Sequence, residues 1–292
     1  MFIFSNDNTE EIYEKNKHLL HPDIMEHINA RNFMRDALVQ LEYHANSRAY
    51  YKLFCRNYDY HMLFYKKNFR GHTKIQKVEY IIDDPNQYNE IINEVWDPNS
   101  DNYFYAGSVK RKIVRVYNRN LVMIQQRCKQ WSWSREKYFY AIAAKYKISE
   151  NKTIFVMASA NIIDHNRKNN KYFENEIVES ANIFQAEIDS EDDIRNGELK
   201  KMFVNLSGYI FEKRKNHIYI TYVDSVNGIH ILIIYFNNLI FDFNIIYSNE
   251  INKMVRMIQY KCYVDVIIFY ICSVCFIICV RYSSHLAMSS FK

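Results

Sequence analysis

The residues that could do chemistry in this sequence are few, and no catalytic motif joins them. Asp164 and His165 are adjacent, as an acid and a general base could be, but they lie in a stretch rich in Asn and Lys with no Ser or Cys nucleophile tied to them. His217 falls in an expected turn. Solvated loops account for both histidines more simply than catalysis does. The sequence therefore predicts no catalytic residue and no enzyme.

The six cysteines do not form the pattern of a metal site or of a disulfide framework. Cys55 and Cys128 lie far apart in the main body of the sequence. The other four crowd into one apolar stretch: Cys262, Cys272, Cys275 and Cys279. The paired CxxC knuckles typical of zinc sites are missing, and apolar packing or lipidation is the simpler role for cysteines on one helical face. We expect no metal and no cofactor.

Aromatic and aliphatic side chains suggest a different kind of site, one for apolar molecules. Aromatic residues make up 16% of the chain, with 25 Tyr and 19 Phe, enough to fill a large core or to line a roomy pocket. Burying an acyl chain in such a pocket gives about 0.8 kcal/mol per CH₂. The candidate lipid-binding residues on one strand face are Tyr140, Ile142, Val156, Ala158, Val204 and Leu206. The alternating face offers Phe139, Ala141, Phe155 and Met157. Sequence does not decide which face points inward, and each residue could instead fill a solid core.

A lipid headgroup would need a few buried polar partners. Arg115, Arg127 and Ser159 lie on expected strands and could serve this purpose. The alternative for each is a solvated strand face or a salt bridge within the sheet.

Long antiparallel strands would have to position these residues. Residues 138–143 and 154–159 alternate with a period of two around the polar turn 149–152, which is the pattern of a strand hairpin. Further strands are expected at 50–56, 61–66, 73–82, 110–117, 121–127, 202–209 and 217–224. Apolar spacing predicts helices at 23–47 and 85–95, and residues 177–188 also show helical spacing. This order of elements indicates an α+β protein.

Composition and charge limit the domain organisation and the partners. The 292 residues can hold one large domain or two small ones. We expect a flexible segment at 1–22, a folded domain at 23–228 and an atypical hydrophobic tail at 229–292. Within the tail, residues 262–280 could span a bilayer. No signal peptide is visible. The net charge of +5 could favour an anionic membrane surface but does not by itself indicate nucleic acid.

Several motifs resemble the START (StAR-related lipid transfer) domain. They are Trp96-Asp97 at the end of a helix, Ser134 to Tyr140 at the start of a central strand, Ser207-Gly208-Tyr209, and Asp224 to Gly228. The resemblance implies a helix-grip fold in which a curved antiparallel sheet encloses a lipid cavity. It also implies a non-enzymatic protein that binds a phospholipid such as phosphatidylcholine and transfers it between membranes.

Longer stretches, including EVWDPN, REKYFYAIAAK and KKMFVNLSGY, resemble the Fam-A proteins of rodent malaria parasites. That resemblance implies export to the host erythrocyte or the parasite vacuole membrane. The tail after Gly228 departs from the pattern, because the long amphipathic helix that closes the family's lipid pocket is absent or replaced.

Two alternatives stay open. The first is a membrane-anchored interaction protein at the host-cell or parasite membrane, whose tail is a real anchor and whose cavity is vestigial. The second is an enzyme built on the same fold, which would need a polar triad inside the cavity. Oligomeric state, the particular lipid and any host partner are not indicated.

Overall fold

The computed structural model describes residues 8–58, 61–71, 73–99, 108–129, 134–169 and 172–227. All of them belong to the first of two units into which the chain divides, Met1–Leu232. The tail 229–292, its segment 262–280 and the place of a closing helix lie outside the described residues. Within the described ranges, no helix is both long enough and apolar enough to cross a membrane.

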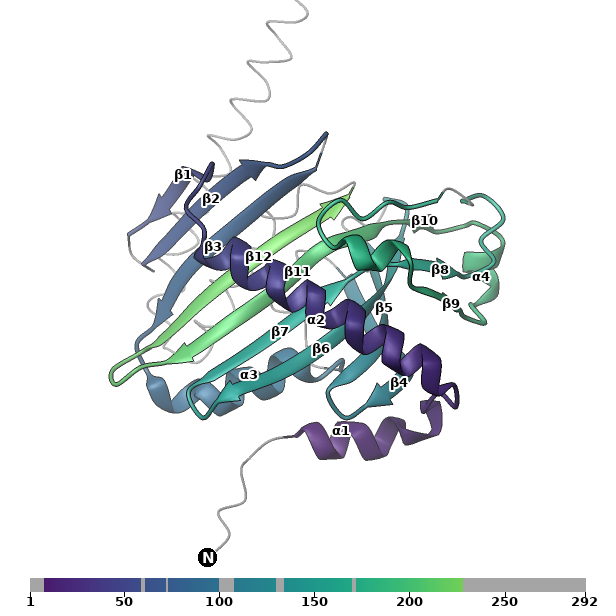
Figure 1. The fold of residues 1–292 in the computed structure, drawn as a ribbon, viewed down its shortest axis with the longest axis horizontal. Helices are drawn as coiled ribbons and strands as arrows, with labels where there is room; N and C mark the ends of the chain where they lie inside the picture. Colours follow the sequence, from purple (N-terminus) through teal and green to yellow (C-terminus); the bar gives the residue numbers. More distant parts are fainter. Residues whose placement is uncertain are drawn as a thin grey trace, which may run out of the picture. The chain divides into compact units, whose positions relative to one another are not determined.

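One long antiparallel sheet organises the described part of the chain (Figure 1). Its strands follow the spatial order β1-β2-β3-β12-β11-β7-β6-β5-β4, and β10 pairs in parallel with β6. In sequence order they are β1 (Lys52–Asn57), β2 (Met62–Asn68), β3 (Lys74–Ile82), β4 (Ser108–Asn118), β5 (Leu121–Lys129), β6 (Lys137–Ser149), β7 (Lys152–Ala158), β10 (Lys200–Lys201), β11 (Phe203–Lys213) and β12 (Ile218–Asn227). The strands expected from period-two alternation are all present within a few residues.

Helix α2 (Ile24–Asn46) crosses one face of this sheet (Figure 1). The Asp23 side chain begins it by accepting a hydrogen bond from the Met25 backbone N–H, at 2.7 Å. Its buried stripe recurs at three- and four-residue steps: Ala30, Phe33, Met34, Ala37, Leu41 and Ala45. At the other end, the buried Lys77 Nζ donates to the carbonyl oxygens of Ala45 and Ser47 at 3.1 and 2.9 Å, so it satisfies carbonyls that a helix end leaves free.

Helix α3 (Tyr88–Trp96) lies on the opposite face of the sheet and follows the short 3₁₀ turn η2 (Pro85–Gln87). The Trp96 ring stacks on Phe155 of β7 with a centroid separation of 5.9 Å. The Tyr88 hydroxyl donates to Thr153 Oγ1 at 3.1 Å. These two contacts hold α3 against the middle of the sheet.

The first residues are more ordered than expected. Residues 9–19, part of the segment predicted to be flexible, form α1 (Thr9–Asn16) and the 3₁₀ turn η1 (Lys17–Leu19). Asn8 donates two hydrogen bonds to Asn93 of α3, from its backbone N–H and from its side-chain amide, and Lys145 Nζ donates to Thr9 Oγ1 at 2.7 Å. These contacts reach residues far away in sequence, so local composition could not reveal them.

The segment between β7 and β11 packs beside α2 and adds a small parallel pair of strands. It contains β8 (Asn161–Ile163), η3 (Glu179–Asn182), β9 (Gln185–Glu187) and α4 (Asp192–Arg195). The helical spacing of residues 177–188 was misleading, because only a 3₁₀ turn and a short strand form there. Asn175 explains the difference, since its side-chain oxygen accepts from the backbone N–H groups of Ile177 and Val178 and fixes a turn. The α+β class itself is confirmed.

Candidate functional site

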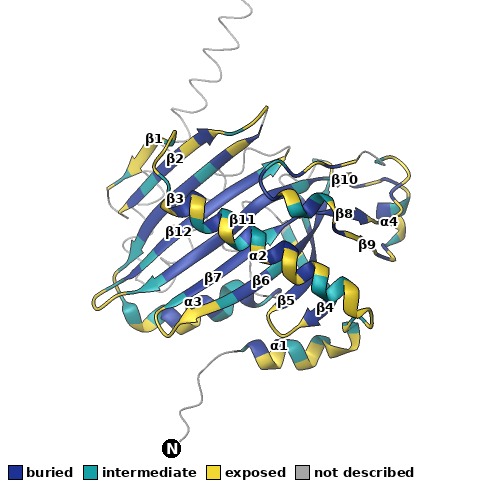
Figure 2. Cartoon of the chain, viewed as in Figure 1, coloured by how far each residue is buried: buried dark blue, intermediate teal, exposed yellow. Residues whose placement is uncertain are grey.

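The sheet presents two faces with different neighbours. Residues opposite one another in an antiparallel ladder share a face, and successive residues alternate. The face that contacts α2, which we call the α2 face, carries Ile142, Val156 and Ile210. The other, which we call the α3 face, carries the alternate residues such as Phe155, on which Trp96 of α3 stacks. Figure 2 shows how strongly the central strands of this sheet are buried.

Most of the predicted lipid-binding residues lie on the α2 face. Tyr140, Ile142, Val156, Ala158 and Leu206 belong to one buried cluster with the apolar stripe of α2. Gly208 lies beneath Leu41, and a Cβ there would approach Leu41 Cδ2 to 2.8 Å, so helix and sheet are in close contact. Their role as ligand contacts stays a prediction, and this packing favours the alternative of a solid core.

Val204, the remaining apolar candidate, does not share a face with Leu206. A β-bulge between the two shifts the register, so that Val204 pairs with Val226 whereas Leu206 pairs with Ser225. Since Val226 and Ser225 are successive residues on β12, they point to opposite faces. Alternation along the sequence could not show this extra residue.

Arg115 anchors the start of α2. Its Nη1 donates to Glu26 Oε1 at 2.6 Å, and the Tyr117 hydroxyl donates to the same oxygen at 2.7 Å. Its other nitrogen donates to the Glu187 carbonyl. A guanidinium used in this way is a structural ion pair, as the alternative reading of Arg115 proposed.

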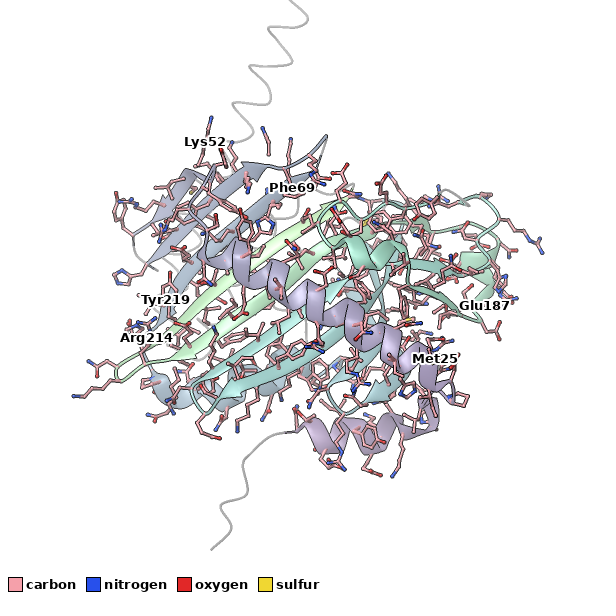
Figure 3. The ribbon with its side chains drawn as sticks, in the orientation of Figure 1. Met25, Lys52, Phe69, Glu187, Arg214 and Tyr219 are labelled. Atoms are coloured by element: carbon pink, nitrogen blue, oxygen red, sulfur yellow. The ribbon has the colours of Figure 1, made fainter. Side chains whose placement is uncertain are left out.

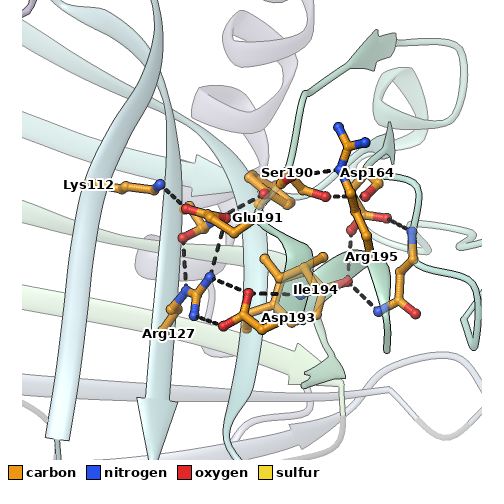
Figure 4. Close-up of polar contacts among 12 residues, drawn as sticks. Lys112, Arg127, Asp164, Ser190, Glu191, Asp193, Ile194 and Arg195 are labelled. Carbon is orange, nitrogen blue, oxygen red and sulfur yellow. Dashed lines mark hydrogen bonds and ion pairs between the residues drawn. The ribbon is translucent and has the colours of Figure 1, made fainter. Parts of the chain in front are cut away.

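Arg127 is held in a polar cluster with the loop around α4 (Figure 4). Its two terminal nitrogens contact the Asp193 carboxylate at 2.5 and 3.0 Å, and one also lies 3.2 Å from Glu191. Burial opposes ionisation of Glu191, but hydrogen bonds from Lys112 and Gln125 lower the pKa of its carboxyl to about 2. The pKa of Asp193 is also lowered, chiefly by the hydrogen bond from Arg127. The cluster fastens the α4 loop to the sheet.

Ser159 is also occupied by the fold. Its hydroxyl donates to the Tyr140 carbonyl at 2.7 Å and accepts from the Val204 backbone N–H at 2.9 Å. The three polar candidates of the sequence therefore have structural partners, and the structure does not bring them together.

The α3 face is aromatic along its middle. One row of residues crosses the sheet from β2 to β7, and each residue pairs with the next one on the neighbouring strand: Phe64, Val78, Tyr222, Tyr209 and Phe155. The Tyr209 and Tyr222 rings stack with centroids 4.4 Å apart, and Phe211 packs edge-on against Phe155 at 5.7 Å. Such a row of rings offers apolar contact area to a ligand.

A second row on the α3 face changes from polar to apolar. Lys52, Lys66, Gln76, Asp224 and Ser207 lie opposite one another in turn across β1, β2, β3, β12 and β11. The same row then continues with Met157, Ala143 and Val122 on β7, β6 and β5. A ligand lying along this row would meet cations and a carboxyl at one end and hydrocarbon at the other.

Asp224 is the unusual member of this row. Its residue is only 4% exposed, and burial raises the pKa of its carboxyl to about 6, although hydrogen bonds from Ser207 and Tyr222 oppose the rise. Within the described residues its Oδ1 has no hydrogen-bond partner, and neither does the buried Trp96 Nε1 of α3. Buried polar atoms are usually paired, so these two mark positions where a ligand could supply the missing partner.

Other chemistry finds little support in the described residues. Ser207 bonds to Tyr222 and Asp224, and no histidine in the described ranges hydrogen-bonds to it. His165 lies on an exposed loop with its Nε2 2.9 Å from Glu187. No group of three or more potential metal ligands occurs in the described ranges.

The fold is similar to that of human StAR-related lipid transfer protein 5, with a TM-score of 0.50 and 10% sequence identity over 73% of this chain and 94% of that one. Human STARD10 gives a TM-score of 0.48 with 9% identity over 75% of this chain and 76% of that one. The human StarD13 (DLC2) lipid transfer and protein localization domain gives 0.42 with 11% identity over 64% and 79%.

No family model and no curated protein matches the sequence. At 10% identity the first likeness establishes the fold alone, and it confirms the expected α+β, START-like architecture. The expected relationship to Fam-A proteins gains no support from sequence comparison.

Sequence reasoning missed the pairing of Asp224 with Ser207, although both residues stand in motifs that it singled out. Ser207-Gly208-Tyr209 and the stretch beginning at Asp224 are separated by the β11–β12 turn, and the ladder sets Ser207 directly opposite Asp224. Counting back from that turn along both strands would have predicted this contact.

Proposed function

We propose that this chain binds one lipid against the α3 face of its sheet and carries it between membranes without chemical change. The observation that carries the proposal is the α3 face itself, where a continuous aromatic and aliphatic surface contains one buried carboxyl with an unpartnered oxygen. The START-like fold supports it, because a protein of similar fold, human StAR-related lipid transfer protein 5, is described as a lipid transfer protein.

The chemistry of this face favours a phospholipid with a cationic headgroup, such as phosphatidylcholine. Near pH 7 a carboxyl with a pKa of about 6 is largely ionised, and the approach of a cation favours the ionised form further. Asp224 lies beside the Tyr222 and Tyr209 rings, and aromatic faces attract quaternary ammonium groups. Acyl chains would then lie toward Met157, Ala143 and Val122, along the apolar half of the row.

Two finer statements belong to the same proposal. The resemblance of the sequence to Fam-A proteins supports a place in that family, and with it export to the host erythrocyte or the vacuole membrane. Both rest on sequence resemblance alone.

Transfer of fluorescent phosphatidylcholine between donor and acceptor liposomes tests the proposal with the full chain. Ala143→Phe adds a ring to the apolar half of the α3 face and is expected to lower transfer at least tenfold. Val39→Phe adds the same ring to an exposed position of α2, 60% exposed, and is expected to leave transfer unchanged. Equal transfer by both variants would contradict a site on the α3 face.

Lipid that co-purifies in the absence of detergent gives a second readout. We expect close to one phospholipid per chain, and less for Ala143→Phe. A full chain that carries no lipid, transfers none and stays with membranes after extraction at high pH would instead support the membrane-anchored interaction protein.

A further inference from the structure

The edge of the sheet formed by β1 and β2 is unusually exposed and unusually basic. Every residue from Lys52 to Arg56 is exposed, and within the described ranges β1 pairs with β2 alone. Residues 48–74 hold seven Lys and Arg against the single acidic residue Asp59, a net charge of +6 in a chain whose total is +5. The positive charge is therefore concentrated here rather than spread along the sequence.

Large apolar side chains are exposed among these cations. Tyr50 is 85% exposed, Tyr58 74%, Leu53 43% and Phe54 40%. Figure 2 shows β1 as an exposed strand beside the buried centre of the sheet, and Figure 3 shows Lys52 and Phe69 at this end. We call the set of Tyr50, Lys52, Leu53, Phe54, Arg56, Tyr58 and Lys66 the basic aromatic edge.

The cations of the basic aromatic edge lie against rings instead of carboxylates. Lys66 Nζ is 5.2 Å from the Phe54 ring centroid, and the Arg56 guanidinium is 5.5 Å from that of Tyr58. The neighbouring Lys67 is only 8% exposed, and four rings surround its Nζ at 5.5 to 5.8 Å: Tyr43, Tyr50, Tyr51 and Phe69. Lys52, Arg56 and Lys66 are exposed, and in the described part of the chain no acidic side chain pairs with them, so their charge is free to meet an external anion.

We propose that the basic aromatic edge docks the protein onto an anionic lipid membrane. Tyrosine and phenylalanine suit the boundary between water and hydrocarbon, and each Lys or Arg near an anionic leaflet adds to the attraction. Lys52 and Lys66 also begin the polar row of the α3 face, which runs on to Asp224. A membrane bound at this edge would therefore meet the end of the face that we assign to the lipid.

Two other occupants fit less well. A strand from a second chain would need a regular edge, but a β-bulge between Leu53 and Cys55 interrupts the ladder of β1. A single-stranded nucleic acid would also be attracted by cations and rings. Continuity with the apolar α3 face favours the membrane, because a charged nucleic acid strand would not bind along that apolar surface.

This proposal rests on the proposed function, but docking on a membrane can be measured without any transfer of lipid. The full chain is floated with vesicles of phosphatidylcholine alone and with vesicles of equal parts phosphatidylcholine and phosphatidylserine. We expect binding to the anionic vesicles only, and weaker binding at high salt. The double variant Lys52→Glu/Lys66→Glu should reduce that binding at least tenfold, and Tyr50→Ser/Phe54→Ser should reduce it at low and high salt alike.

Lys15→Glu/Lys215→Glu is the matched control, since it reverses two exposed lysines on α1 and on the β11–β12 turn. Equal loss of binding in this control would overturn the proposal, because it would show a general charge effect. Unchanged vesicle binding by Lys52→Glu/Lys66→Glu would also overturn it. So would a result in which these substitutions abolish self-association, or binding of a single-stranded oligonucleotide, but leave vesicle binding intact. A chain that carries no lipid but still docks through this edge would refute the proposed function and leave docking in place.

Discussion

Asp224 on β12 lies directly opposite Ser207 on β11, and both side chains are buried on the sheet face that α2 does not cover. Hydrogen bonds from Ser207 and Tyr222 lower the pKa of this carboxyl against the effect of burial, whereas its Oδ1 has no partner within the described residues. An incompletely satisfied carboxyl costs stability unless something else fills its coordination. We infer that the site is shaped for a ligand and not for the stability of the empty protein.

The first prediction concerns the pH dependence of stability. A carboxyl whose pKa rises from 3.8 to about 6 on folding holds its proton more tightly in the folded state. Its contribution to stability is therefore present at pH 4 and is lost as the pH rises through 6. Asp224→Asn cannot ionise and avoids this loss. The free energy of unfolding of the variant, minus that of the unaltered chain, should therefore increase by on the order of 2 kcal/mol between pH 4 and pH 7.

Chemical denaturation of both proteins at several pH values measures that difference. Other acids, such as Glu191 with its lowered pKa, change both proteins equally and cancel in the comparison. A difference that stays constant from pH 4 to pH 7 would show that the Asp224 pKa is not raised. Phosphatidylcholine should also bind more weakly to Asp224→Asn if the carboxylate holds its headgroup.

The second prediction compares two neighbouring alanines on opposite faces of β6. Ala144 is 2% exposed and belongs to the cluster beneath α2, whereas Ala143 lies on the α3 face and is only partly buried. Ala144→Phe should therefore lower the free energy of unfolding by about 2 kcal/mol or more, because a packed core cannot accept a ring. Ala143→Phe should cost much less and should act mainly on lipid binding. Thermal unfolding of the two variants checks this, and equal losses would mean that both faces are solidly packed.

The third prediction concerns Gly208, over which α2 crosses the sheet. A Cβ at this position would come within 2.3 Å of the Phe155 carbonyl oxygen and 2.8 Å of Leu41 Cδ2. Gly208→Ala should destabilise the fold by about 3 kcal/mol, since backbone atoms in a ladder cannot move aside. Leu41→Ala removes only the side-chain contact, so the double variant should not recover stability. Recovery in the double variant would place the clash in the helix instead of the ladder.

The fourth prediction concerns the contact between Arg127 and the α4 loop. Arg127→Met leaves Asp193 and Glu191 without their shared guanidinium and should cost about 2 kcal/mol, with faster backbone hydrogen exchange in residues 189–195. The matched control is Arg214→Met, which removes an exposed ion pair with Glu212 and should cost less than about 0.5 kcal/mol. Unchanged exchange in the α4 loop would show that other contacts hold it.

The sequence by itself determined the strands, the two main helices and the α+β class. Period-two alternation in residues 137–158 and the three- to four-residue stripe of α2 depend on neighbours in sequence, and local patterns report such contacts directly. Its aromatic richness also indicated an apolar site. It could not say which face of the sheet would bear that site, because both faces of the central hairpin are apolar.

Tertiary structure decided which face becomes the core beneath α2, through contacts between distant residues. The stripe of α2 covers Tyr140 and Ile142, which makes their face a core and leaves Phe139, Ala141, Phe155 and Met157 on the other. The bulge beside Asn205 separates Val204 from Leu206, and the ladder of β11 and β12 brings Asp224 to Ser207. Each of these outcomes follows from the free energy of packing whole elements together, and no local window of sequence contains it.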